Sequence, residues 1–198
     1  MKKNNFFFFV CLAVSLVCIT ACKYGIVQKP KNLASLQEDS IYTKSILEKS
    51  KNGYWLVARG YKWTDDLVAT ATVTDYSHAA VLDMSTQSVI EADSKGVHES
   101  SLAHFVNHSY RITIVKPGGY TSPRGVLAVQ VAREKLGKPY DFLGTVGLNN
   151  PDKYYCSELA ACSYSHLKDS LKLPLIVEPV YLLKLGTVIY ETPERKIK

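Results

Sequence analysis

The sequence predicts a small α+β domain, with an antiparallel sheet or small barrel packed on helices. Two observations carry this prediction. Short β-branched or aromatic runs bounded by Gly, Asp or Ser dominate residues 54–115, whereas clear helical periodicity begins only after Ser122. Runs of strands followed by runs of helices are typical of α+β domains. The length of 198 residues fits one domain with a short leader.

Composition excludes several classes of protein. With 46% apolar and 21% charged residues, the chain does not have the composition of a disordered protein. It contains no apolar run of about 18 residues, which argues against a conventional membrane-spanning helix. The 24 Lys and Arg outnumber the 18 Asp and Glu but are scattered, so we expect no nucleic-acid partner.

The N-terminus has the pattern of a secretory leader. A cationic start, Met1–Lys3, precedes the 14-residue apolar run Phe6–Ile19, which has the length of a signal-peptide core. The run ends in Ile19-Thr20-Ala21-Cys22, which resembles a bacterial lipobox. Residues 1–21 are therefore predicted to be a lipoprotein signal peptide, with Cys22 the lipidated first residue. Ordinary secretory cleavage with an incidental Cys22 is the alternative.

Lipidation would hold the protein to a membrane, because two or three acyl chains anchor firmly. Lys23 is not the aspartate that resembles an inner-membrane retention signal, so the outer membrane is favoured in a cell with two membranes. Cys156 and Cys162 are then the remaining thiols. Six residues of helix separate them by about 9 Å, beyond the roughly 7 Å limit between Cα atoms of a disulfide.

The mature chain divides into residues 22–52, a tether and leading helix; residues 53–192, the domain; and residues 193–198, a tail. Ser40–Lys51 is weakly helical, Ser101–Asn107 favours a helical turn, and Asp65–Thr74 is ambiguous between strand and helix but favours helix. The expected strands are Tyr54–Arg59, Ala79–Asp83, Ser88–Ala92, Tyr110–Val115, Ile176–Val180 and Thr187–Tyr190.

Two helices are predicted in the second half. The first has Ser122 as N-cap, Pro123 at the first helical position and Gly137 at its end. Its periodic residues are Val126, Val129, Ala132, Arg133 and Leu136. The second helix begins near Cys156 and runs to about Leu167. Leu159, Ala160, Ser163 and Leu167 are expected on one face of this helix.

Cys156 is the residue best placed for chemistry. Gly-rich phosphate loops, Gly-x-Ser-x-Gly elbows and His-Glu-x-x-His are all absent from the sequence, so we expect neither cofactor nor metal. A thiolate at a helix start is stabilised by backbone N–H groups and the macrodipole, and the same N–H groups can bind an oxyanion. A small buried cysteine at a helix–sheet contact is the alternative reading.

A base is available on the neighbouring strands. His78 opens an apolar strand, and Glu91 is the only charge within the next one. A carboxylate in an apolar strand needs a partner, and an imidazole is a natural one. If the two strands form a hairpin, Glu91 could orient His78 toward a cysteine. A core histidine and a solvent-facing carboxylate are the alternatives.

The other histidines have weaker patterns. His104 and His108 are four residues apart and could share a zinc face, but nothing nearby completes a ligand set. His98 lies in the same polar segment with no assigned role. His166 is expected to complement the C-terminus of the Cys156 helix.

Four segments taken together resemble the permuted papain-like enzymes of the NlpC-type superfamily, specifically the YiiX-like group. They are Tyr76–Leu82, Ile90–Ala92, Gly137–Asp141 and Tyr155–Leu159, in the order of that group. The resemblance covers roughly residues 54–166. It implies a circularly permuted papain-like fold with the nucleophile at a helix N-terminus.

The resemblance also implies roles: Cys156 as nucleophile, His78 as base and Glu91 as the residue that orients it. Tyr140, Tyr155 and Glu158 match positions expected to line or support the substrate site. The leading expectation is a monomeric cysteine hydrolase that cleaves amide bonds of envelope peptides. A lipid acyltransferase or thioesterase and a non-catalytic envelope binding lipoprotein are the alternatives.

Overall fold

A computed structural model describes residues 33–61, 74–170 and 173–195. The expected signal peptide, Cys22, the first part of the tether and most of Asp65–Thr74 lie outside these residues. Within them, no helix is both long and apolar enough to cross a membrane.

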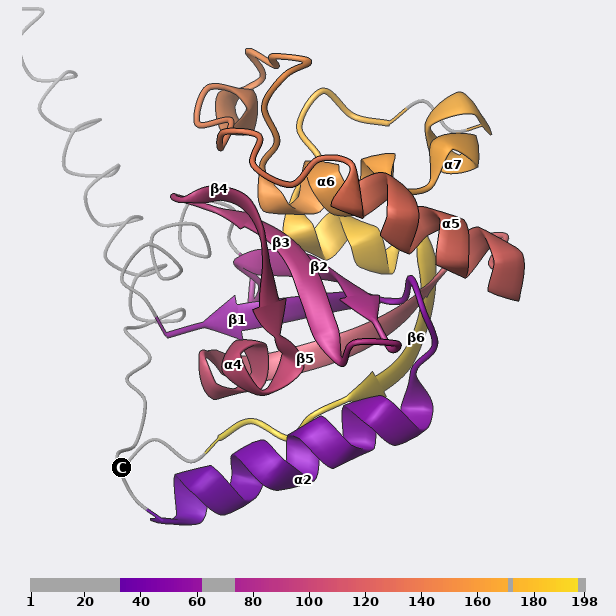
Figure 1. The fold of residues 1–198 in the computed structure, drawn as a ribbon. Helices are drawn as coiled ribbons and strands as arrows, with labels where there is room; N and C mark the ends of the chain where they lie inside the picture. Colours follow the sequence, from indigo (N-terminus) through magenta and orange to yellow (C-terminus); the bar gives the residue numbers. More distant parts are fainter. Residues whose placement is uncertain (1–32, 62–73, 171–172, 196–198) are drawn as a thin grey trace, which may run out of the picture.

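One six-stranded antiparallel sheet forms the centre of the molecule (Figure 1). Its spatial order is β4-β3-β2-β1-β5-β6, so the first four strands follow one another as neighbours, in reverse order across the sheet. The strands are β1 (Trp55–Gly60), β2 (His78–Asp83), β3 (Ser88–Asp93), β4 (Gly96–Ser101), β5 (Ser109–Pro117) and β6 (Gly186–Glu191).

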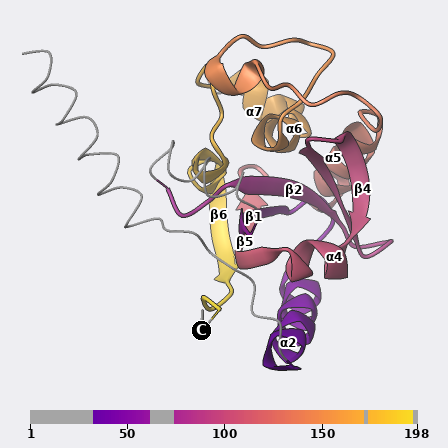
Figure 2. The same ribbon diagram turned by 90° about the vertical axis from the view of Figure 1, so that its left-hand side faces the viewer.

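Helices cover both faces of the sheet (Figures 1 and 2). On one side lie α2 (Leu33–Lys49) and α4 (Leu102–Asn107). On the other lie α5 (Ser122–Arg133), α6 (Cys156–Cys162) and α7 (Ser165–Ser170), with the 3-10 turn η2 (Pro179–Leu183) packed beside them. A second 3-10 turn, η1 (Gly144–Val146), interrupts the long loop between α5 and α6.

Strand alternation supplies a core to each face. Trp55 and Val57 of β1 pack with Leu159 of α6, whereas Leu56 and Ala58 pack toward α2 and α4. All six residues of β1 are buried, as expected for a central strand covered on both sides. The α+β class is confirmed, and the sheet is open along the order given above.

Three element predictions are corrected. The α5 N-cap is Thr121, whose side chain accepts from the Arg124 N–H, and its buried residues are Gly125, Ala128, Val129 and Ala132; Val126 and Leu136 are exposed. Ile176–Val180 forms no strand, because Pro179 opens η2 instead. Residues 96–101, expected as part of a polar segment, form β4.

The long helix predicted from Cys156 to Leu167 is divided into α6 and α7. Ser163 Oγ donates to Ala160 O at 2.6 Å, and Tyr164 N–H donates to Ala161 O, three residues back. Such local bonds compete with the α-helical ladder. His166 consequently lies in α7, where its Nε2 donates to Gly118 O at 3.0 Å rather than serving the end of the Cys156 helix.

The end of the described chain packs against its beginning. Thr192 exchanges two hydrogen bonds with Ile112 of β5, each 2.9 Å, and Tyr42 of α2 donates to Pro193 O at 3.0 Å. The Arg195 side chain is fully buried against α2. Residues 192–195 and α2 therefore pack on the same side of the sheet. The proposed division into leading helix, domain and tail stays a prediction.

Candidate active site

His78 is the first residue of β2, and its two predecessors fix the entry of that strand. The Tyr76 hydroxyl donates to Glu191 Oε1 of β6 at 2.9 Å. Ser77 Oγ accepts from the Gly60 N–H of β1 at 3.0 Å. These contacts tie the residues before His78 to β1 and β6, which fixes the backbone that carries the imidazole.

Glu91 lies on β3, where it pairs directly with Ala80 of β2 in the antiparallel register. His78 is two residues from Ala80, so it can reach Glu91 diagonally across the two strands. His78 Nε2 donates to Glu91 Oε2 at 2.6 Å. The sequence-based expectation of a hairpin contact between these two residues is confirmed.

Cys156 opens α6 and is 5% exposed. Both of its neighbours are bound to Val177: Ser157 Oγ donates to Val177 O at 2.6 Å, and Tyr155 Oη accepts from the Val177 N–H at 3.0 Å. The Cys156 thiol lies close enough to the His78 side chain to raise the pKa of the imidazole. Because His78 Nε2 is bonded to Glu91, Nδ1 is the ring nitrogen left to face the thiol.

The surroundings favour a charged His78–Glu91 pair. Burial acts to lower the pKa of His78, but hydrogen bonds and negative charge from Cys156 and Glu91 outweigh it, so the pKa lies well above 6.5. Burial acts to raise the pKa of Glu91, but the His78 hydrogen bond and charge, with a bond from Ser100, lower it to about 2. The pair therefore holds an imidazolium and a carboxylate near neutral pH.

The residues expected to line the substrate site have defined surroundings, and their substrate role stays a prediction. Tyr155 is 3% exposed, and its hydroxyl oxygen accepts the hydrogen bond from the Val177 N–H. Tyr140 forms an isolated bridge with Tyr154, and its ring lies 4.7 Å from that of Phe142. Glu158 lies in the first turn of α6.

Two residues near Glu91 received no role from the sequence. Ser100 Oγ donates to Glu91 Oε1, and His98 Nε2 is 3.6 Å from the same oxygen. Both lie on β4. The turn residues Asp93–Gly96 followed by Val97 were a hairpin signal that could have revealed this strand.

His104 and His108 contact each other on α4 and at its end. Their rings stack, with centroids 4.1 Å apart, and His108 Nδ1 donates to His104 O. Among the described residues, no group of three or more His, Cys, Asp or Glu could hold a metal ion.

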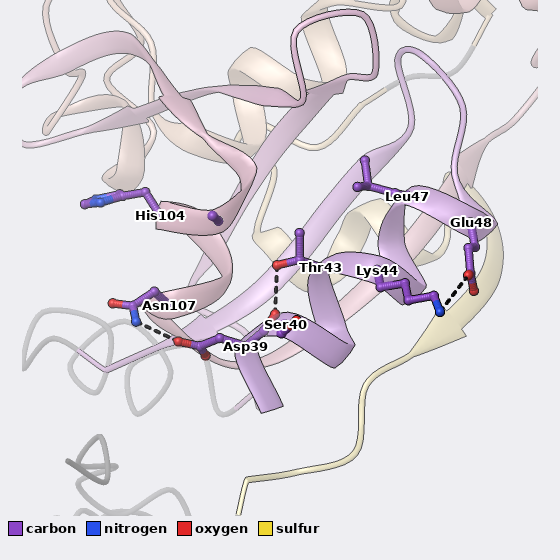
Figure 3. Close-up of a pocket in the computed structure, with 9 residues that line it drawn as sticks. Asp39, Ser40, Thr43, Lys44, Leu47, Glu48, His104 and Asn107 are labelled. Carbon is purple, nitrogen blue, oxygen red and sulfur yellow. Dashed lines mark hydrogen bonds and ion pairs between the residues drawn. The ribbon is translucent and has the colours of Figure 1, made fainter. Parts of the chain in front are cut away.

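A surface hollow of about 830 Å³ lies between α2 and α4 (Figure 3). Asp39 and Thr43 of α2 and His104 and Asn107 of α4 contribute to its lining. Its polar groups largely bond to one another, as in the 2.6 Å bond from Asn107 Nδ2 to Asp39 Oδ2. Neither Cys156, His78 nor Glu91 lines it, so this hollow is separate from the candidate site.

A cysteine at a helix start, facing a histidine held by a carboxylate beside an antiparallel sheet, is the arrangement of papain-like thiol enzymes. The order along this chain is permuted, because the histidine and its strand precede the cysteine helix. The family model of the permuted papain-like amidases, YaeF/YiiX, C92 family, matches residues 60–182. The chain belongs to this family, and is thus a papain-like amidase by family.

Among solved structures, the fold is similar to the crystal structure of the metalloprotein YiiX from Escherichia coli O157:H7, with a TM-score of 0.57 and 21% sequence identity. The match covers 74% of this chain and 98% of that one. At this identity the likeness concerns the fold. No curated protein matches the sequence significantly.

Proposed function

We propose that the protein is a cysteine hydrolase that cleaves amide bonds through a thioacyl-enzyme formed on Cys156. The observation that carries the proposal is the position of His78 between the Cys156 thiol and Glu91, with the Glu91 bond at 2.6 Å. The family of permuted papain-like amidases supports the same reaction class.

In the proposed mechanism, the proton of the Cys156 thiol resides on His78, and the thiolate sulfur attacks the carbonyl carbon of the amide. His78 then donates that proton to the leaving amine as the C–N bond breaks, which leaves a thioester on Cys156. A water molecule, deprotonated by His78, attacks the thioester and releases the acid and the thiol. Glu91 stays ionised throughout and stabilises the imidazolium.

The start of α6 supports the nucleophile and the oxyanion. Tyr155 is the N-cap residue, and its side chain makes no capping hydrogen bond to the start of the helix. Backbone N–H groups at a helix start can donate hydrogen bonds to the carbonyl oxygen of the substrate as negative charge develops on it. We propose peptide amides of the cell envelope as substrates, because the lipobox pattern ending in Cys22 predicts a protein tethered there.

A lipid acyltransferase or thioesterase is the second candidate, and one surface feature favours it. Five apolar side chains, each at least 60% exposed, lie on the loops that precede α6 and η2: Phe142, Leu143, Val146, Leu148 and Leu175. The two loops touch, since Asn149 Nδ2 donates to Leu175 O at 3.1 Å. Exposed apolar side chains gathered in this way are typical of surfaces that contact lipid or another protein.

The proposal is tested with purified protein incubated with isolated peptidoglycan sacculi, and separately with phospholipid vesicles, followed by mass spectrometry of the products. We expect new amine and carboxylate ends from sacculi. Cys156→Ala and His78→Ala should each abolish turnover, because nucleophile and base act as a unit. Free fatty acid from vesicles, with intact sacculi, would support the lipid alternative.

Cys162→Ala is the matched control, because Cys162 is a second free thiol at the far end of the same helix. It should keep full activity. Iodoacetamide should alkylate Cys156 much faster than Cys162 near neutral pH. Full turnover by Cys156→Ala, or alkylation of Cys156 that does not depend on His78, would overturn the thiol mechanism and favour a non-catalytic binding protein.

A further inference from the structure

The two carboxylate oxygens of Glu91 have different partners. Oε2 accepts from His78 Nε2, and Oε1 accepts from Ser100 Oγ. His98 faces Oε1 from the same strand as Ser100, with Nε2 at 3.6 Å. The Glu91 side chain is only 10% exposed, so these three residues provide most of the polar surroundings of the carboxylate.

The position of Ser100 is fixed by the β3–β4 ladder. Glu91 pairs directly with His98, and Val89 pairs with Ser100. Ser100 is two residues beyond His98, so both side chains project from the face that carries Glu91. Two residues later the chain enters α4, whose Phe105 ring lies 5.9 Å from the His78 ring. A short segment of chain thus contacts both members of the His78–Glu91 pair.

A carboxylate held through one oxygen can still rotate, because its terminal torsion is broad. A second donor on the other oxygen fixes the plane of the group, which keeps Oε2 directed at His78. The hydroxyl also satisfies an oxygen that would otherwise be largely removed from water, a loss that costs free energy. Consistent with this, the bond from Ser100 acts to lower the pKa of Glu91.

We infer that Ser100 is a positioning residue of the active site. Its hydroxyl holds Glu91 in the orientation that stabilises the protonated imidazole of His78 beside Cys156. The inference rests on the proposed thiol mechanism and adds a fourth residue to it. Ser100 acts through Glu91. The titratable groups that face this carboxylate are His78 and His98, and Asp93 lies 3.7 Å from the other nitrogen of His98.

The test is the rate at which iodoacetamide alkylates Cys156, measured across pH by mass spectrometry of the Cys156 peptide, so that no substrate is needed. Ser100→Val and Ser100→Thr are nearly isosteric, and only the second keeps a hydroxyl. We expect Ser100→Val and Ser100→Ala to slow alkylation at neutral pH by about 3- to 10-fold, as for the loss of one ordinary hydrogen bond. The pH midpoint of alkylation should move upward, and Ser100→Thr should restore both values.

Ser88→Ala is the matched control. Ser88 Oγ donates to the Glu99 carboxylate in the same hairpin, so the variant removes a similar bond that has no link to His78. It should leave the alkylation profile unchanged. Thermal unfolding checks that each variant is folded; if Ser100→Val does not fold, the comparison of Ser100→Ala with Ser100→Thr decides.

Two outcomes separate this inference from the proposed function. If Ser100→Val alkylates like the wild type, or Ser100→Thr is as slow as Ser100→Val, the hydroxyl has no positioning role, although the thiol mechanism stands. If alkylation of the wild type is itself unaffected by His78→Ala, the proposed function fails first.

Discussion

The 2.6 Å hydrogen bond between His78 and Glu91 makes the ionisation of each residue depend on the other. The imidazolium lowers the pKa of Glu91 to about 2, against 4.5 for an ordinary glutamate, despite the opposing effect of burial. Because the folded-state pKa is below the unfolded-state value, the ionised carboxylate stabilises the fold above about pH 4.5. That stabilisation disappears as the pH falls toward 2.

The first prediction is that Glu91→Gln flattens the acid dependence of stability. Between pH 5.5 and pH 3, the wild type should lose about 2 kcal/mol more of its free energy of unfolding than the variant, because Glu91 becomes protonated in the unfolded chain while it stays ionised in the fold. Urea unfolding at the two pH values measures the difference. Glu48→Gln, which alters a 59% exposed carboxylate, should keep the wild-type slope. Equal slopes for wild type and Glu91→Gln would contradict the prediction.

The same substitution separates the roles of the three site residues. Glutamine retains the shape of Glu91 but not the charge that stabilises the imidazolium, so turnover should fall by about 10²- to 10⁴-fold rather than vanish. His78 has a raised pKa in the fold, so its stabilisation is present below about pH 6.5 and is lost as the pH rises through the folded-state value.

At the residue scale, the sequence predicted the meeting of His78 with Glu91 because each stands out locally, the histidine at a strand start and the carboxylate inside an apolar strand. Ser100 could not be found in this way. A serine in a polar segment has no distinguishing pattern, and its role depends on a β3–β4 register that was not predicted. The hydrogen bonds of Tyr155 and Ser157 to Val177 could not be found in this way either, because Val177 is 22 and 20 residues further along the chain.

At the scale of elements, the contact between α5 and the start of β1 depends on two glycines. Gly53 has a φ of +79°, and a Cβ there would lie 2.5 Å from Gly125 O. A Cβ on Gly125 would lie 2.2 Å from Asn52 O and 2.6 Å from the Tyr120 ring. The backbone of α5 therefore approaches the turn before β1 more closely than any side chain would allow.

The second prediction is that Gly125→Ala destabilises the protein, although alanine is the better helix former by about 1 kcal/mol. The added methyl group must displace backbone atoms, and overpacking of this kind costs about 1–3 kcal/mol beyond the propensity gain. Urea unfolding measures the net change. Val126→Ala, at a 55% exposed position of the same helix, should alter stability by less than about 0.5 kcal/mol. A Gly125→Ala variant more stable than the wild type would contradict the prediction, because it would show that α5 and the turn before β1 can move apart without cost.

The strands expected near residues 54–115 formed because each is a short apolar run with clear ends. The α5 helix was found from its proline and its period, but not all of its periodic residues are buried, because small residues such as Ala128 and Gly125 pack where close approach is required. Periodicity identifies the larger apolar residues, and it cannot distinguish an exposed Val126 from a buried one. The break between α6 and α7 was also missed. At the break, the Tyr164 hydroxyl donates to Gly53 O, 111 residues away, a contact that no local pattern reveals.

At the scale of the whole molecule, Arg195 joins the end of the described chain to its beginning. Its guanidinium binds the Asp39 carboxylate, donates to Val106 O at 2.9 Å and lies 4.9 Å from the centroid of the Tyr42 ring. The side chain is 0% exposed and that of Asp39 is 14% exposed. A buried ion pair of this kind is costly to break from one side, because the other charge is left without compensation.

The third prediction is that Arg195→Met lowers the free energy of unfolding by about 3–5 kcal/mol. Lys44→Met is the control on the same helix: its pair with Glu48 is 3.8 Å apart and both side chains are largely exposed, so the change should stay below about 1 kcal/mol. Chemical denaturation of both variants measures the contrast. Comparable losses in the two variants would mean that the Asp39–Arg195 contact contributes no more than a surface pair.

The contacts of Arg195 also determine when the fold can be completed. The Asp39–Arg195 bond spans 156 residues of sequence, and the bond from Tyr42 to Pro193 spans 151. A ribosome synthesises the chain from its N-terminus, so α2 is made long before the residues that hold it in place. Contacts between residues so far apart in the sequence form slowly and are among the final ones to form. A chain that carries an export leader, as the first 21 residues predict, would therefore leave the ribosome with its final closure still to be made, which keeps it competent for threading through a membrane before it folds.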